Sequence, residues 1–149
     1  MSFVVDCSVS LAWFLTDERS AFTDSVLRAT ETADHWVPAI WPLEFANGML
    51  MAERRRRIDR TSRLEALRRV LMPGLRVDTA PCDMQTISSL AERRSLTTYD
   101  ASYLELALRL GLDLVTLDRD LASAGASEGI QVQSPGRSGV AQRRRRYNI

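Results

Sequence analysis

The chain has 149 residues, with 45% hydrophobic and 26% charged side chains and a net charge of +1, which is the composition of one globular domain with room for a core. Its 20 basic residues are all arginine and it has one histidine, which excludes a phosphate-binding lysine and a two-histidine acid–base pair, and its two distant cysteines predict neither a disulfide framework nor a structural zinc site. No apolar run is long enough to cross a bilayer and the first residues lack the basic start of a signal peptide, so we expect a cytoplasmic protein without a membrane segment.

Short apolar strands alternate with helices in the first part of the chain. Phe3–Val5 is predicted to be a strand, and Ser8 is predicted to cap the helix that follows it. A second helix is predicted over residues 20–32. His35–Val37 is predicted to be the second strand, in which His35 is a strand-edge residue rather than a catalyst.

The middle of the chain predicts two more helices and a third strand. A helix is expected from Ala39 onward with a kink at Pro42, and Arg54–Arg57 closes it, where cations favour a helix carboxyl end. These arginines either contact phosphates or form a solvated helix end. The next helix is predicted over Thr61–Leu71, and Leu75–Val77 is predicted to be a strand.

The following helices carry clear start and stop signals. A helix is predicted over Cys82–Arg94. Thr97 and Asp100 then have the spacing of a capping box, which predicts the start of another helix. Gly111 predicts its end, and Leu114–Leu117 is predicted to be a buried strand.

The last elements complete an alternating pattern. A short helix is predicted over Leu121–Gly125 and a strand over Ile130–Val132. Strands that alternate with helices predict an α/β fold with a short central parallel sheet and helices on both faces. We predict one domain over residues 1–133 and a disordered basic tail over residues 134–149. Four side chains expected on inward helix faces are Leu64, Leu71, Met84 and Leu108.

Four acidic residues fall at element ends or on apolar helix faces: Asp6, Glu44, Asp100 and Asp118. Asp6 and Asp118 each follow a strand, so both are expected at the carboxyl edge of a parallel sheet, where ligands collect. Local explanations stay open, namely a hydrogen-bonded turn for Asp6, a capping box for Asp100 and an N-cap for Asp118. Glu44 has apolar neighbours, and its burial would be costly without a partner.

Clustered carboxylates indicate a metal site. They repel one another and stay ionised together only when a cation compensates their charge. Oxygen ligands suit Mg²⁺ or Mn²⁺, which lower the pKa of a bound water and stabilise charge on a phosphodiester. Without lysine and with a single histidine, metal-dependent hydrolysis is the chemistry that the composition leaves open.

The basic charge is concentrated near the end of the chain. Four of the 20 basic residues form Arg143–Arg146, which leaves 16 against 19 acidic residues and a net charge of −3 for the remainder. This run either holds RNA electrostatically or is a tail without a role.

Three segments together resemble a PIN domain, and most closely the VapC-type toxins of bacterial toxin–antitoxin pairs. They are the strand followed by Asp6-x-Ser8, the segment PAIWPLEFANGM, and the segment TTYDASYLELALRLGLDLVTLDRDL, which is the most specific of the three. The similarity runs from Phe3 to about Val132, so it does not reach the basic run at the end of the chain. It implies a three-layer α/β/α fold.

The resemblance also implies an activity and roles for particular residues. It implies a Mg²⁺- or Mn²⁺-dependent endoribonuclease with RNA as substrate. The implied catalytic and metal-binding residues are Asp6, Glu44, Asp100 and Asp118, and the supporting polar residues are Ser8, Asn47 and Thr116. Asp120 departs from the family pattern, because that place is often basic or neutral, and we expect it to face solvent rather than to bind metal.

The resemblance further implies a homodimer and a cognate antitoxin that docks in a groove. The first helices carry more apolar residues than a small sheet needs, which predicts an interface that includes Trp13, Phe14, Phe22, Trp41, Met49 and Leu50. One alternative is a non-catalytic PIN-like module for RNA binding or scaffolding, although all four acids are present. Another is a DNA-directed nuclease, for which 149 residues leave little room.

Overall fold

Five short strands form a parallel sheet at the centre of the computed structural model, which describes residues 1–136. Their order is β3-β2-β1-β4-β5, and every neighbouring pair is parallel. The strands are β1 (Phe3–Val5), β2 (His35–Val37), β3 (Leu75–Val77), β4 (Asp113–Val115) and β5 (Val132–Gln133). The predicted strands are all present. β4 ends at Val115 rather than at Leu117, and β5 begins at Val132 rather than at Ile130.

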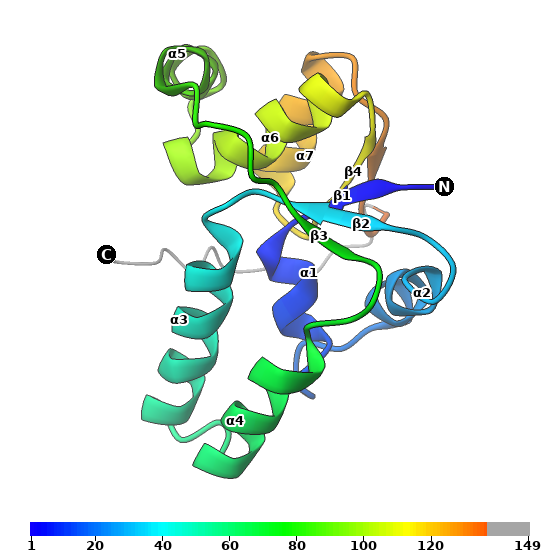
Figure 1. Cartoon of the computed structure of the whole chain (residues 1–149), viewed down its shortest axis with the longest axis vertical. Helices are drawn as coiled ribbons and strands as arrows, with labels where there is room; N and C mark the ends of the chain where they lie inside the picture. The colour runs from blue at the N-terminus through cyan, green and yellow to red at the C-terminus, as the bar shows by residue number, and fades with distance from the viewer. Residues whose placement is uncertain (137–149) are drawn as a thin grey trace.

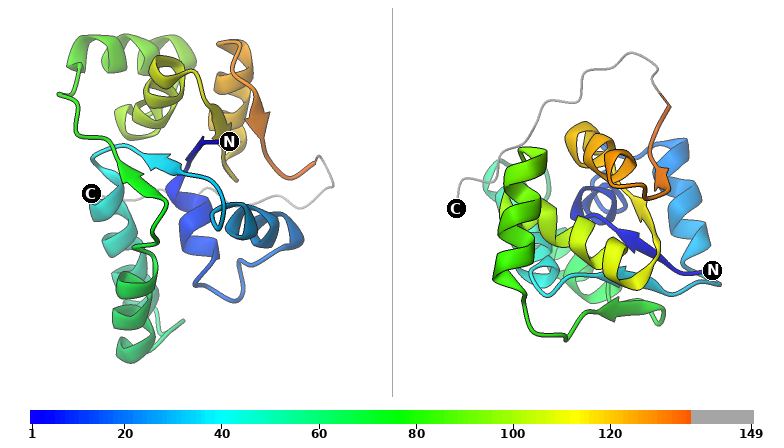
Figure 2. Two further views of the ribbon diagram at one scale, coloured as in Figure 1. Left: turned by 45° about the vertical axis from the view of Figure 1, so that its right-hand side comes forward. Right: turned by 90° about the horizontal axis from the view of Figure 1, so that it is seen from above.

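Seven helices within residues 1–136 cover the two faces of the sheet and confirm the predicted three-layer α/β/α fold. They are α1 (Cys7–Ala12), α2 (Ala21–Ala29), α3 (Trp41–Arg54), α4 (Arg60–Arg69), α5 (Met84–Arg94), α6 (Thr98–Leu110) and α7 (Arg119–Ser127). In Figure 1, α5, α6 and α7 lie above the sheet and α1 to α4 below it, and Figure 2 shows the two layers from further sides. Helix α6 packs on β1 and β4, and α7 packs on β4 and β5.

The central strand β1 is apolar throughout because both of its faces are covered. All three of its residues are buried, which is typical of a central strand in a parallel sheet. Val4 lies between Trp36 of β2 and Leu114 of β4. Since the strands are parallel, the residues that follow β1 and β4 lie at the same edge, and the backbone N–H of Asp6 donates to the carbonyl of Val115 at 2.9 Å.

The helix signals in the sequence work largely as predicted. The hydroxyl of Thr97 accepts a hydrogen bond from the backbone N–H of Asp100 at 3.1 Å and begins α6. Gly111 ends this helix with a φ of 65°, a conformation that glycine adopts without steric cost. The kink predicted at Pro42 is wrong. Pro42 lies in the first turn of α3, where its missing N–H removes no helical hydrogen bond.

The apolar side chains of the first helices mostly fill the core. Trp13, Trp41 and Met49 are at most 6% exposed, so the prediction that these three side chains lie in an interface is wrong. The indole N–H of Trp41 donates to Ser10 Oγ at 3.2 Å, and its ring stacks on Phe45 with the centroids 5.4 Å apart. Of the other residues in that set, Phe14 and Phe22 are partly buried against the core, and Leu50 is partly buried.

Four side chains predicted to face inward are instead exposed. The exposed fractions are 43% for Leu64, 67% for Leu71, 77% for Met84 and 41% for Leu108. Helix α4 packs mainly on α3, and α5 packs mainly on α6, rather than on the sheet. The helix faces that become buried on α4 and α5 are therefore narrow, which leaves Leu64 and Met84 exposed. Leu71 lies beyond the end of α4, and Leu108 lies on α6, which packs on the sheet through other residues.

The end of the chain lies largely beyond the described residues. Residues 134–136 follow β5 without helix or strand. The rest of the predicted tail, including Arg143–Arg146, lies outside the described part of the chain. Within residues 1–136, no helix combines the length and the apolar character needed to cross a membrane.

His35 is the first residue of β2, as expected for a strand-edge residue, and it is buried. It is 1% exposed, and its ring lies between those of Phe3 and Trp13 at centroid distances of 6.2 and 6.3 Å. Neither ring nitrogen makes a hydrogen bond of normal geometry within residues 1–136. Burial lowers the pKa of His35, because the charged imidazolium loses its hydration.

This environment predicts an acid-sensitive contribution to stability. The unfolded chain binds a proton at His35 near pH 6.5, and the folded chain does so only at lower pH. The stability that neutral His35 provides is therefore fully present above about pH 6.5 and is lost as the pH falls toward the folded pKa. The raised pKa values of Asp6 and Glu44 act in the opposite direction in this range. Urea unfolding of wild type and His35→Phe at several pH values isolates the effect of His35. As the pH falls below about 6.5, the free energy of unfolding of the wild type should fall relative to that of the variant. A difference in unfolding free energy that does not change with pH would contradict the assignment.

Candidate active site

Asp6 is held at the carboxyl edge of the sheet by two hydroxyl groups. Its side chain is buried, and Oδ2 accepts hydrogen bonds from Ser8 Oγ at 2.6 Å and from Thr116 Oγ1 at 2.9 Å. The prediction that Ser8 caps α1 is wrong. Ser8 lies inside the helix, and Asp6 occupies the N-cap position without a side-chain cap bond. The Ser8 hydroxyl is used to orient the carboxylate instead.

The same hydroxyls join Asp6 to the loop after β4. Ser8 Oγ accepts from the backbone N–H of Leu117 at 3.2 Å, and Thr116 Oγ1 accepts from the N–H of Asp118 at 3.0 Å. Burial is the main reason that the pKa of Asp6 is raised, and the two hydroxyl bonds oppose the shift. The charge of Asp118 raises it further, so the two carboxylates interact.

Glu44 is paired with a tyrosine that the sequence analysis did not identify. Tyr103 is completely buried in α6, and its hydroxyl donates to Glu44 Oε1 at 2.6 Å. A signal was available, because Tyr103 follows Asp100 by three residues and so lies near it on the same face of the helix. The partner that Glu44 was expected to need is therefore Tyr103.

The ionisation of Glu44 is shifted into the neutral range. Burial is the largest cause and raises its pKa to about 7, while the hydrogen bond from Tyr103 acts in the opposite direction. The charges of Asp6 and Asp100 raise it as well. Asp6 thus interacts electrostatically with both Asp118 and Glu44, and Glu44 with Asp100, so all four predicted acids belong to one electrostatic group.

The N-cap explanation for Asp118 also applies, and Thr97 caps the helix turn that contains Asp100. Asp100 lies in the capped first turn of α6 and is partly buried. Asp118 is the N-cap of α7, where Oδ1 accepts from the backbone N–H groups of Asp120 and Leu121 at 2.8 and 3.0 Å. The cap bonds fix the carboxylate of Asp118, whereas at Asp100 the bond from Thr97 holds the backbone, and both acids still act on a neighbouring acid.

Two further predicted residues lie outside this group. Asn47 is partly buried on α3, one turn after Glu44, and its side chain makes no hydrogen bond within residues 1–136. Asp120 is exposed on α7, where it lines a hollow of about 460 Å³ with Arg93 and Arg94. A role for Asn47 at the site stays a prediction.

The donor set fits a hard divalent cation by its chemistry. Within residues 1–136, no three histidine, cysteine, aspartate or glutamate side chains converge at ligand distances, so the acids do not form a closed cage. Mg²⁺ rarely needs one, because it is usually held by one or two carboxylates and keeps several waters and substrate oxygens. Carboxylates that repel one another in the pairs Asp6–Asp118, Asp6–Glu44 and Glu44–Asp100, two of them with raised pKa values, are the environment that such a cation stabilises.

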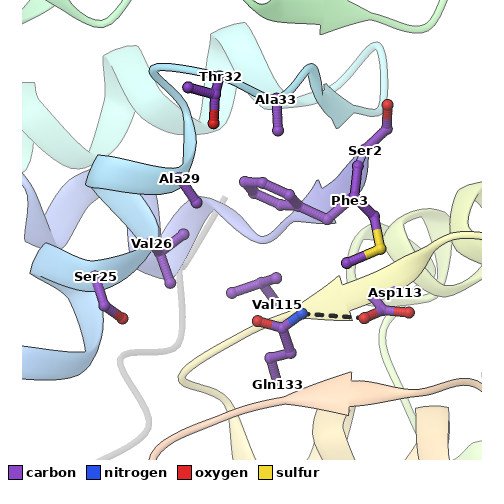
Figure 3. A pocket seen from close by; sticks show the side chains of 11 residues that line it. Ser2, Phe3, Ser25, Val26, Ala29, Thr32, Ala33, Asp113, Val115 and Gln133 are labelled. Atoms are coloured by element: carbon purple, nitrogen blue, oxygen red, sulfur yellow. Dashed lines mark hydrogen bonds between the residues drawn. The ribbon is translucent and has the colours of Figure 1, made fainter.

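A separate pocket lies away from the acids. It has a volume of about 300 Å³ and is lined by residues of α2 and of the strands, among them Phe3, Val26 and Asp113. Figure 3 shows this pocket, with Gln133 Nε2 donating to Asp113 Oδ2 at 3.0 Å. Phe3 and Asp113 begin β1 and β4, so the pocket is near the amino ends of these strands, whereas the acids follow the carboxyl ends.

Comparisons with known proteins give concordant matches. The family model of the PIN domain matches residues 3–126. The chain is 30% identical over 125 residues to Ribonuclease VapC3 of Pyrobaculum aerophilum, covering 82% of this chain and 93% of that protein. The crystal structure of PAE2754 from Pyrobaculum aerophilum matches with a TM-score of 0.66 at 28% identity, covering 89% of this chain and 92% of that one. VapBC2 from Rickettsia felis, bound to a DNA fragment from their promoter, matches in fold with a TM-score of 0.63 at 11% identity, covering 90% and 98%.

Proposed function

Because this chain belongs to the PIN-domain family, we propose that it is a metal-dependent endoribonuclease that hydrolyses RNA phosphodiester bonds and acts as the toxin of a toxin–antitoxin pair. The observation that carries the proposal is the group of four carboxylates, in which Asp6 and Asp118 follow β1 and β4 at one edge of the sheet and Glu44 interacts electrostatically with Asp6 and Asp100. The likeness to Ribonuclease VapC3 supports the reaction class. A non-catalytic RNA-binding or scaffolding module explains the four carboxylates less well, because carboxylates that repel one another away from bulk water are costly unless a bound cation compensates their charge.

Asp6, Glu44, Asp100 and Asp118 are the residues that would hold Mg²⁺ or Mn²⁺. When bound, such an ion supplies a Lewis acid that stabilises charge on the phosphodiester and lowers the pKa of the attacking water. The chain itself supplies the orientation of the ligands. Ser8 and Thr116 fix the carboxylate of Asp6, Tyr103 fixes that of Glu44, and the α7 cap fixes that of Asp118.

Removal of metal at several pH values tests the proposal. Protein freed of metal with EDTA should not cleave single-stranded RNA, and Mg²⁺ or Mn²⁺ should restore cleavage. Below its pKa of about 7, Glu44 holds a proton that must leave before the carboxylate binds a cation. The Mn²⁺ concentration for half-maximal cleavage should therefore fall with rising pH, by up to about tenfold per pH unit below pH 7, and level off above it.

Glu44→Gln is the control for this profile, because it removes the titrating group and keeps the side-chain size. In that variant the Mn²⁺ requirement should be higher and its pH dependence flatter. Full cleavage in EDTA would overturn metal dependence. An equally steep profile in Glu44→Gln would assign the pH dependence to another residue.

We further propose two protein partners and a cytoplasmic location, where RNA is available. The first partner is a cognate antitoxin, supported by the likeness to VapBC2. The second is another copy of this chain. Large apolar side chains on the surface support it, notably Leu43, Leu71 and Met84, which are 71%, 67% and 77% exposed.

A homodimer is expected in solution at micromolar concentration. The physical reason is that apolar side chains exposed on the single chain lose their contact with water in an interface. Sedimentation velocity measures the mass directly. A species with the mass of one chain at this concentration would contradict the homodimer, and it would leave the nuclease proposal unaffected.

A further inference from the structure

The segment that joins α3 to α4 carries a concentrated positive charge. Residues 53–60 contain five arginines against two carboxylates. Four of these arginines are exposed and are here named the basic tip: Arg54, Arg55, Arg56 and Arg60. In Figure 1 this connection lies at the end of the α3–α4 pair farthest from the sheet.

The arginines of the basic tip differ from the others in having no partner within residues 1–136. Eight arginines of this part of the chain form ion pairs: Arg19, Arg57, Arg63, Arg68, Arg76, Arg93, Arg94 and Arg109. Arg69 lies over the ring of Phe14, and Arg119 has an interaction of its own. Apart from Arg28, the arginines of residues 1–136 without a partner in that range are therefore the four of the basic tip.

The backbone beneath these side chains is fixed. Arg57 binds Asp17 at 2.6 Å and Glu18 at 3.0 Å, and Arg63 of α4 pairs with Glu53 of α3. Arg56 has a φ of 58°, a left-handed conformation that a residue with a Cβ adopts at some cost. Unpaired guanidinium groups are thus presented from a braced turn rather than from a loose loop.

The basic tip is placed to meet a polymer that reaches the acids. Glu44 and the tip arginines lie toward opposite ends of α3, and the ten residues from Glu44 to Arg54 correspond to a rise of about 15 Å. Along the axis of one regular helical strand, at about 3.4 Å per phosphate, this is about four to five phosphates. The acids repel phosphates, so a bound strand gains from cations outside the site. The guanidinium fork matches two phosphate oxygens at once.

We propose that the basic tip is a second contact for the RNA strand, which binds its phosphates away from the cleavage site. The proposal rests on the proposed function, since it assigns the tip to the same substrate. RNA fits better than an acidic peptide, because residues 53–60 have no exposed large apolar side chain to anchor a protein partner. Phosphate binding needs no such anchor.

The test compares two triple variants with the same change of charge. One is Arg54→Gln, Arg55→Gln and Arg60→Gln, which removes tip arginines and spares Arg56 and the paired Arg57. The matched control is Arg19→Gln, Arg68→Gln and Arg93→Gln, which removes three ion-paired arginines elsewhere. Both are made in an Asp6→Asn background so that labelled single-stranded RNA stays intact during binding.

The readout is the dependence of RNA affinity on salt concentration. The slope is that of the logarithm of RNA affinity against the logarithm of salt concentration. Three lost phosphate contacts should reduce its magnitude by about 2, since each contact to a single strand contributes about 0.7. The control variant should keep nearly the full slope. Equal slopes in the tip variant and the unmutated background would overturn the proposal, as would an equal loss in the control, which would indicate net charge alone. Lost binding of polyglutamate with an unchanged RNA slope would assign the tip to an acidic protein and also overturn it.

A cleavage assay distinguishes failure of this proposal from failure of the nuclease proposal on which it rests. With Asp6 intact, the tip variant should retain its single-turnover rate at saturating protein, because the tip does not touch the reacting phosphate. If the wild type never cleaves RNA, but binds it with a salt slope that the tip variant reduces, the nuclease proposal fails and the tip proposal stands. If the wild type cleaves RNA and the slopes coincide, the tip proposal alone fails.

Discussion

Asp6→Asn is expected to abolish RNA cleavage, with a loss of about 10³-fold or more, which is the scale of removing one main source of electrostatic stabilisation. Asp6 lies at the centre of the acid group, because its charge acts on Glu44 and it is itself affected by Asp118. Asparagine keeps the size of the side chain and an oxygen that can accept from Ser8 and Thr116. The expected loss is therefore one of charge and metal binding rather than of shape.

The fold of this variant should be unharmed. Burial and a neighbouring charge raise the pKa of Asp6, so ionising this side chain costs more free energy in the folded protein than in the unfolded chain. A neutral side chain should leave the free energy of unfolding equal or higher, and urea unfolding measures this. Asp113→Asn, at the start of β4 and away from the acids, is the matched control and should cleave normally. Full activity of purified Asp6→Asn would remove the proposed mechanism.

Tyr103→Phe is expected to produce the second largest effect, because it removes the hydroxyl that fixes Glu44 and nothing else. The loss of a group that orients a metal ligand typically lowers metal affinity or activity about 10- to 100-fold. The hydrogen bond from Tyr103 also lowers the pKa of Glu44. Without it, Glu44 should bind its proton more strongly, and the pH at which cleavage rises should shift upward.

That pH shift distinguishes an effect on the site from a general loss of packing. Cleavage is measured against Mn²⁺ concentration at several pH values for wild type, Tyr103→Phe and Tyr99→Phe. Tyr99 is 43% exposed in the first turn of the same helix, so its hydroxyl provides the control and should be dispensable. A lower activity of Tyr103→Phe with an unshifted pH profile and an unchanged Mn²⁺ requirement would show that the tyrosine does not act through Glu44.

The sequence by itself determined the features that depend on near neighbours along the chain. The apolar run at Phe3–Val5, the cap at Thr97 and the stop at Gly111 are local signals, and each predicted its element correctly. The placement of Asp6 and Asp118 after two strands followed from the parallel sheet alone, since strand polarity decides which edge a following residue occupies. That these acids bind a metal stays a prediction.

Only the tertiary structure decided which side chains meet across the fold. Tyr103 and Glu44 are 59 residues apart in the sequence, and Thr116 and Asp6 are 110 apart, so no local pattern specifies either pair. The same holds for Trp41 and Met49, whose apolar character predicts burial against something without saying whether that is the core or a partner. The charge run after α3 could be read in the sequence, but its unpaired state could not. Whether an arginine finds a carboxylate depends on how the packed helices place distant residues: Arg57 pairs with Asp17, whereas Arg55 has no such partner among residues 1–136.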